Sequence, residues 1–303
     1  MSVSTEGVAR GYAACTELAR SHYENFPVAS WLLPARMRPH VAAVYAFARI
    51  ADDLADEGDA GAGERQARLR SWQGRLHRAV AGEAHEGPLD RDALILTAVG
   101  HSIRSLDLPI ALFDDLVTAF GQDTTTTRYA SWDEVLEYCA RSANPVGRLV
   151  LRIAGYRDAA LDRSADAMCT ALQLTNFWQD FGRDWRIGRL YVPREVQQAC
   201  GAREETLGPG TLDPSWVRAI EASVTFTRAR FAEGRAVCQG VRGRLGLELR
   251  LTWLGGLRIL ERVERGTADL FDQRPSLGAA DVPRLVWQAL VYQSWGPPSG
   301  GPS

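Results

Sequence analysis

The stretch YAFARIADDLADE, from Tyr45 to Glu57, decides the fold together with a second stretch, QLTNFWQDFGRD, from Gln173 to Asp184. In the first, positions 45, 49, 52 and 56 are separated by four, three and four residues. In the second, positions 173, 176, 180 and 184 are separated by three, four and four. These separations place each row of polar side chains on one face of a helix. Acidic side chains at this spacing repel one another, and bound cations would remove the repulsion.

Apolar residues surround both acidic rows. Residues 41–47 are apolar nearly all round, which indicates a buried helix, and Phe177, Trp178 and Phe181 lie among the acids of the second row. Buried carboxylates need ion pairs, hydrogen bonds or a metal as partners. Carboxylate oxygens suit Mg²⁺, which keeps several waters and completes its shell with substrate phosphates. Either row alone would be explained equally well by the solvent-exposed face of a surface helix. The two together favour a magnesium-held diphosphate, with structural ion pairs as the open alternative.

Helical periodicity runs through the whole chain, and no clean alternating pattern between turn signals predicts a strand. We therefore predict an all-α fold, a single helical bundle over residues 1–295 around a central cavity. A disordered, low-complexity tail is expected at 296–303. Pro145 falls inside a helical pattern and predicts a kink. The expected helices cover about residues 8–22, 39–57, 62–82, 89–105, 109–121, 131–154, 158–185, 214–240, 244–270 and 281–294.

The composition excludes several classes of protein. A formal net charge of −2 gives no basic field for nucleic acid. All 35 basic residues are Arg, so a phosphate-loop lysine and a Schiff-base lysine are both impossible. The five cysteines are scattered, which argues against a disulfide framework or a zinc site. Neither a signal peptide nor a membrane-spanning run is evident. We expect a cytoplasmic protein, and peripheral contact with the inner membrane is compatible with that.

With these features the chain resembles the squalene/phytoene synthase family, the head-to-head trans-isoprenyl diphosphate synthases, from about residue 12 to residue 270. Within that family it is most similar to the bacterial branch of hopanoid biosynthesis, the hydroxysqualene synthases. The segments that carry the resemblance are the two acidic helices, Glu24–Ser30, Leu32–Pro34, Tyr138-Cys139, Ser142–Gly147, Asn176–Phe181 and Arg189-Leu-Tyr191-Val-Pro193.

The resemblance implies an isoprenoid synthase fold and a set of site residues. It implies that Mg²⁺ is held by Asp52, Asp53, Asp56, Asn176, Asp180 and Asp184. The same five aspartates and Tyr45 are the expected catalytic residues. The residues expected to bind the substrate diphosphate are Arg49, Gln173, Asn176, Arg189 and Tyr191. Aromatic rings that could line the cavity and stabilise a cation are Phe26, Phe47, Phe177 and Trp253.

Departures from the family pattern narrow the expected reaction. Relatives that condense two farnesyl chains usually carry Arg where Gln179 stands and Glu where Arg183 stands. Loss of that Arg favours one large substrate. We therefore expect a carbon–oxygen lyase that converts presqualene diphosphate and water to hydroxysqualene and diphosphate. Neighbouring hopanoid-pathway enzymes are plausible partners, because a thirty-carbon chain diffuses poorly in water.

Two other functions stay open. The first is a head-to-head prenyltransferase that makes presqualene diphosphate, squalene or phytoene from two prenyl diphosphates. The second is a non-catalytic scaffold relative. Such a protein would be expected to have lost acidic residues, whereas all six expected metal positions are occupied in this chain.

Overall fold

The chain divides into two compact units. Unit 1 comprises Met1–Thr126 and Tyr138–Asp162, and unit 2 comprises Thr127–Glu137 and Arg163–Ser303. The computed structural model describes residues 5–21, 32–83 and 90–292. Phe26 and the tail at 296–303 therefore lie outside the described residues. That the two units form one bundle around a central cavity stays a prediction.

Within the described residues every regular element is a helix, and the single β-bridge, between Arg128 and Leu190, is isolated. The predicted all-α class is thus confirmed. Among the described helices, none combines the length and the apolar composition that a membrane crossing requires.

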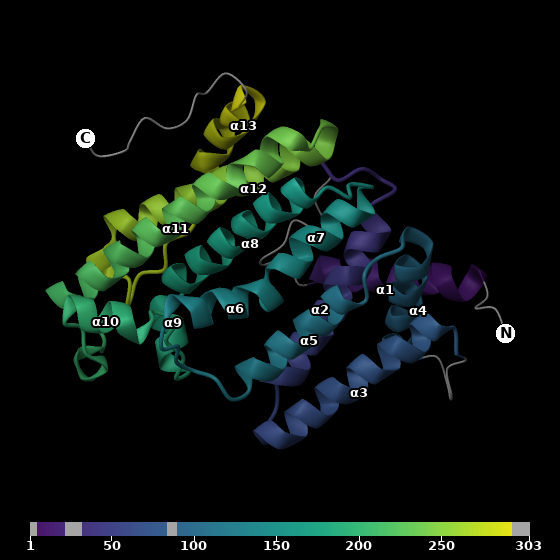
Figure 1. The fold of residues 1–303 in the computed structure, drawn as a ribbon, viewed down its shortest axis with the longest axis horizontal. Helices are drawn as coiled ribbons and strands as arrows, with labels where there is room; N and C mark the ends of the chain where they lie inside the picture. Colours follow the sequence, from purple (N-terminus) through teal and green to yellow (C-terminus); the bar gives the residue numbers. More distant parts are fainter. Residues whose placement is uncertain (1–4, 22–31, 84–89, 293–303) are drawn as a thin grey trace. The chain divides into compact units, whose positions relative to one another are not determined.

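The helices of unit 1 pack around α2, which carries the first acidic row (Figure 1). Phe47 of α2 is fully buried, stacked on Trp72 at 5.6 Å between ring centroids and edge-on to Phe113 at 5.3 Å. This aromatic cluster fixes α2 against its neighbours. The helices are α1 (Thr5–Ser21), α2 (Arg38–Asp56), α3 (Ala62–Ala81), α4 (Arg91–Leu106), α5 (Ala111–Asp123) and α7 (Asn144–Ile153).

A polar cluster joins α1 to α2 and α4. The Tyr12 hydroxyl lies 3.0 Å from His40 Nδ1, 2.9 Å from His101 Nδ1 and 2.9 Å from Ser102 Oγ. Because a buried hydroxyl without a partner is costly, this arrangement specifies one register for α1.

Unit 2 holds α9 (Phe181–Arg186), α10 (Arg194–Cys200), α11 (Pro214–Gly240), α12 (Gly243–Arg265) and α13 (Val282–Leu290). The larger part of α8 (Ala159–Gln179) also belongs to it, and α6 (Trp132–Ser142) divides between the units. Short 3₁₀ turns, η2, η3 and η4, cover Glu204–Thr206, Thr267–Asp269 and Ala279–Asp281. Figure 1 shows α11 and α12 lying side by side.

Buried tryptophans connect the helices of unit 2 through their ring N–H groups. Trp178 of α8 donates to Thr227 Oγ1 of α11 at 2.8 Å, and Trp253 of α12 donates to the Phe231 carbonyl at 2.9 Å. At the start of α11 the Asp213 carboxylate accepts from the backbone N–H of Ser215 at 2.8 Å, as a helix N-cap should.

Several helix boundaries follow the sequence, and two do not. The kink expected at Pro145 is confirmed, since α6 ends at Ser142 and α7 begins at Asn144. The single helix predicted over 158–185 is wrong, because Asp180 separates α8 from α9. The short helix α10 was not predicted, because its seven residues are too few to show a periodic pattern.

Close approach of helices makes Gly11 sensitive to substitution. A Cβ at Gly11 of α1 would lie 2.4 Å from the Leu94 carbonyl oxygen of α4, whereas one at Gly74 of α3 would meet only the end of the Arg78 side chain at 3.7 Å. We predict that Gly11→Ala lowers the free energy of unfolding by about 1–3 kcal/mol through overpacking. The matched Gly74→Ala should raise it by up to about 1 kcal/mol through helix propensity. Urea unfolding measures both, and similar effects of the two substitutions would contradict this packing.

Candidate active site

The first acidic row lies on the C-terminal turns of α2 in unit 1. Arg49 Nη2 is 2.6 Å from Asp53 Oδ1, and Arg49 Nη1 is 3.5 Å from Asp52 Oδ2. The same guanidinium lies 3.6 Å from Glu57 Oε1. One Arg, placed one turn before Asp52, therefore faces three carboxylates. Asp56 is exposed at the end of the helix, and Tyr45 is half-buried three turns earlier.

The second acidic row lies where α8 meets α9 in unit 2. Asn176 Nδ2 donates to Asp180 Oδ2 at 3.0 Å, so the expected face of the helix is present. Asp180 has φ −97° and ψ 12°, outside helical geometry, and separates the two helices. Its side chain is only 14% exposed. Gln173 is half-buried two turns before it.

The Asp184 carboxyl is partly buried and lies among charged side chains. Burial raises the pKa of the Asp184 carboxyl to about 7, and the negative charge of Asp180 adds to the rise. The guanidinium groups of Arg189, Arg183 and Arg274 oppose it. A divalent cation beside this carboxyl would favour its charged form.

The segment after α9 is held in place by residues 127–130 of the same unit. Leu190 N donates to the Thr127 carbonyl at 3.0 Å, and Arg128 Nη1 donates to the Gly188 carbonyl at 2.6 Å. Arg128 Nε also donates to both carboxylate oxygens of Glu204, at 3.0 and 2.9 Å. These bonds position Arg189 and Tyr191, which the sequence had assigned to the diphosphate.

The aromatic residues expected to line a cavity are found in packed surroundings. Phe177 stacks on Tyr191, with ring centroids 3.7 Å apart and planes within 4° of parallel. Trp253 lies edge-on to Phe231 at 6.2 Å. Together with Phe47 in unit 1, they are buried, and their role in lining a substrate cavity stays a prediction.

Arg274 contacts the site and was missed by the sequence analysis. Its Nε and Nη2 approach the two carboxylate oxygens of Asp180, with Nη2 3.2 Å from Oδ2. Arg183, in the motif itself, lies farther from Asp180, at 3.7 Å. No spacing rule connects residues 94 positions apart, so only the packed structure brings them together.

The donor chemistry of both rows fits Mg²⁺. Asp53 Oδ1 is buried and accepts no hydrogen bond within the described part of the chain, so the ion pair with Arg49 is what offsets its charge. Among the described residues, no three Asp, Glu, His or Cys side chains gather into a complete metal site. Mg²⁺ commonly binds through one or two carboxylates plus waters and substrate phosphates, which each row can supply by itself. That the two rows share one site stays a prediction.

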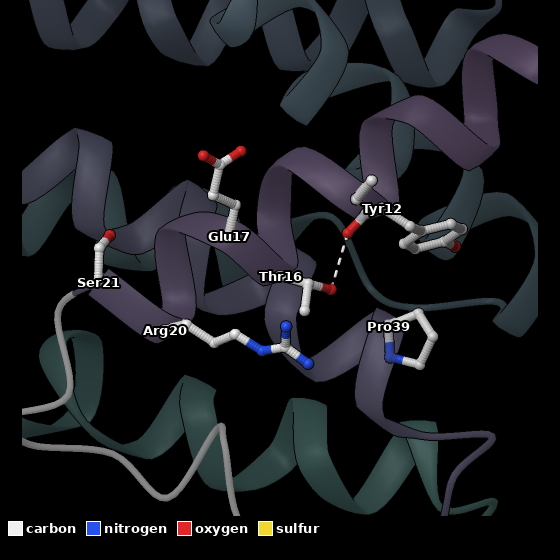
Figure 2. A pocket seen from close by; sticks show the side chains of 7 residues that line it. Tyr12, Thr16, Glu17, Arg20, Ser21 and Pro39 are labelled. Atoms are coloured by element: carbon white, nitrogen blue, oxygen red, sulfur yellow. Dashed lines mark hydrogen bonds between the residues drawn. The ribbon is translucent and has the colours of Figure 1, made fainter.

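A separate cavity of about 620 Å³ lies on α1 in unit 1 (Figure 2). The Thr16 hydroxyl donates to the Tyr12 carbonyl at 2.8 Å on its wall, and Arg20 extends toward Pro39. The lining contains none of the acidic-row residues, so this cavity is no evidence for the substrate chamber. Its lining residues are Tyr12, Ala13, Thr16, Glu17, Arg20, Ser21 and Pro39.

Comparison with known proteins identifies the family. The squalene/phytoene synthase model matches residues 19–281, so the chain belongs to the squalene/phytoene synthase family. A hydroxysqualene synthase of Rhodopseudomonas palustris is 34% identical over 260 residues, covering 84% of this chain and 83% of that protein. A hydroxysqualene synthase of Zymomonas mobilis is 35% identical over 254 residues, covering 82% of each.

A solved structure agrees with the relatives. The squalene synthase HpnC from Alicyclobacillus acidocaldarius superposes with a TM-score of 0.79 at 38% identity, covering 87% of this chain and 96% of that one. The expected isoprenoid synthase fold is therefore confirmed, and with it the resemblance that the two acidic rows indicated.

The contacts of Arg128 predict a local loss of stability. We expect Arg128→Gln to lower the free energy of unfolding by about 1–3 kcal/mol, because it removes charged hydrogen bonds to Glu204 and the Gly188 carbonyl. Arg194→Gln is the matched control, since the Arg194 side chain is exposed, and it should stay within about 0.5 kcal/mol of wild type. Urea unfolding of the full chain measures both. Equal stability of the two variants would show that Arg128 does not hold this segment.

Proposed function

We propose that the chain converts presqualene diphosphate and water to hydroxysqualene and diphosphate, as a Mg²⁺-dependent carbon–oxygen lyase of hopanoid biosynthesis. The observation that carries the proposal is the likeness to two bacterial hydroxysqualene synthases over more than four fifths of the chain. The acidic rows supply the chemistry that such a reaction needs.

The residues proposed to hold Mg²⁺ are Asp52, Asp53, Asp56, Asn176, Asp180 and Asp184. Mg²⁺ bound there supplies positive charge to the leaving diphosphate. Arg49 faces three carboxylates of its own row, and it can exchange one of them for a phosphate oxygen without leaving its charge unpaired. Tyr45, Gln173, Arg189 and Tyr191 are proposed to bind the rest of the diphosphate.

The carbon chemistry requires an apolar, water-poor surrounding. The substrate's C–O bond breaks, and its electron pair leaves with the diphosphate. The cyclopropylcarbinyl cation rearranges to an allylic cation, which one water captures with loss of a proton. Aromatic rings such as Phe177 and Trp253 can stabilise a nearby cation by about 0.5–2 kcal/mol each. No hydride donor is needed, because the reaction is redox-neutral.

The substrate also bears on partners and location. A thirty-carbon chain is driven out of water by the hydrophobic effect. We therefore propose a cytoplasmic enzyme that receives presqualene diphosphate from a neighbouring hopanoid-pathway enzyme or at the inner membrane surface.

Turnover in labelled water tests the function. Incubated with Mg²⁺, presqualene diphosphate and H₂¹⁸O, the protein should release a C30 alcohol that carries one ¹⁸O, detected by mass spectrometry. Asp52→Ala and Asp180→Ala should fold and lose at least about 10²–10³-fold in turnover, the range seen when one electrostatic stabiliser of a transition state is removed.

Asp59→Ala is the matched control, because Asp59 is exposed and lies three residues beyond Asp56. It should retain wild-type turnover. Turnover of farnesyl diphosphate alone to a C30 product would instead identify a head-to-head prenyltransferase. Full activity in both Asp52→Ala and Asp180→Ala would remove the acidic rows from the mechanism.

A further inference from the structure

The segment Phe271–Ser276, the C-terminal strap, is fastened to the two helices that carry the second acidic row. Gln179 Nε2, at the end of α8, donates to the Pro275 carbonyl at 2.6 Å. Arg186 Nη2, at the end of α9, donates to the Phe271 carbonyl at 3.0 Å. The backbone of the strap is therefore fixed on both sides of Arg274.

Close packing explains why the strap lies where it does. A Cβ at Gly182 would lie 1.9 Å from the Phe271 carbonyl oxygen, so only glycine allows the strap to approach α9 this closely. At the other end, Arg262 of α12 donates to the Ser276 carbonyl. Both anchors lie in unit 2, as do the strap and the second acidic row.

Arg274 projects from this fixed backbone onto Asp180. Its Nε and Nη2 contact the two carboxylate oxygens, with Nη2 3.2 Å from Oδ2, and Asn176 also donates to Oδ2, at 3.0 Å. The Asp180 side chain is 14% exposed and that of Arg274 is 34% exposed. The Asp180 carboxylate is thus largely enclosed, with Arg274 and Asn176 against it, whereas the Arg274 guanidinium still reaches the surface.

A cation that binds Asp180 must compete with Arg274 for the same oxygens. A guanidinium displaced from a carboxylate is costly unless it finds another anion. Its planar fork matches a phosphate as well as it matches a carboxylate. With the strap backbone fixed, a diphosphate held beside Asp180 would be within reach of the same side chain.

We propose that Arg274 is a diphosphate-binding residue of the second acidic row: it pairs with Asp180 and passes to a diphosphate oxygen when a divalent cation takes the carboxylate. This inference rests on the proposed function for the presence of a diphosphate. It goes beyond that function by assigning Arg274 two alternative anionic partners.

Binding measurements with Mn²⁺ and inorganic diphosphate test the proposal without the carbon substrate. Mn²⁺ favours the same oxygen ligands as Mg²⁺. By isothermal titration calorimetry, Arg274→Gln should bind Mn²⁺ alone at least as tightly as wild type, because a competing cation has been removed. At saturating Mn²⁺, it should bind diphosphate about 10–100-fold more weakly, the loss expected for a hydrogen bond to a charged group.

The opposite directions of these two effects separate a binding role from a structural one. Loss of both affinities with a lower urea midpoint would show that Arg274 only holds the strap, and would overturn the proposal. Arg274→Lys keeps the charge but loses the fork, so it should fall between wild type and Arg274→Gln in diphosphate affinity. It carries the test if Arg274→Gln does not fold.

Arg228→Gln is the matched control. Arg228 lies in the same unit and pairs with Glu264 at 2.7 Å on an exposed face, so its substitution should change neither affinity. If wild type binds diphosphate and Arg274→Gln binds it equally well, the role of Arg274 is wrong while the proposed function stands. If wild type binds neither Mn²⁺ nor diphosphate, the proposed function fails as well.

Discussion

Carboxylates placed among apolar helices need counter-charges, and this constraint shapes both acidic rows. In unit 1, Arg49 lies within 3.6 Å of Asp52, Asp53 and Glu57. In unit 2, Arg274 contacts both oxygens of Asp180. The Asp180 carboxylate, which is 14% exposed, could not be buried without such a partner, since an isolated buried charge costs far more than a helix contact returns. Packing of the strap brings Arg274 to Asp180, whereas Arg49 lies on the same helix as Asp52 and Asp53.

The exposure of the Arg49–Asp53 pair indicates that it serves more than stability. Arg49 and Asp53 are 30% and 31% exposed, and ion pairs of that kind contribute only about 0–1 kcal/mol. By contrast, Arg152 and Asp162 of the same unit form a more buried, structural ion pair, 15% and 16% exposed, with Nη2 and Oδ2 2.5 Å apart. A reachable guanidinium beside a reachable carboxylate can exchange partners when a ligand arrives. That property suits a site for a charged leaving group.

Short-range sequence rules predicted much of the fold and the carboxylates of both acidic rows. Helical spacing identified the acidic rows, and Pro145 identified the break between α6 and α7. The break at Asp180 was not predictable, because residues 173–184 keep an unbroken helical pattern. The contact of the strap with α9 joins residues far apart in the chain. Arg274 was missed for the same reason. Its partner lies 94 residues away, and no periodicity extends over such a distance.

The central proposal is that the two rows hold divalent cations around one diphosphate. Crystals grown with Mn²⁺ and inorganic diphosphate test it directly through anomalous scattering at the manganese edge. The account predicts manganese peaks within bonding distance of Asp52 or Asp56 and of Asp180 or Asp184, with a single diphosphate bridging them. Peaks confined to one row, with the other row's carboxylates turned to solvent, would contradict it.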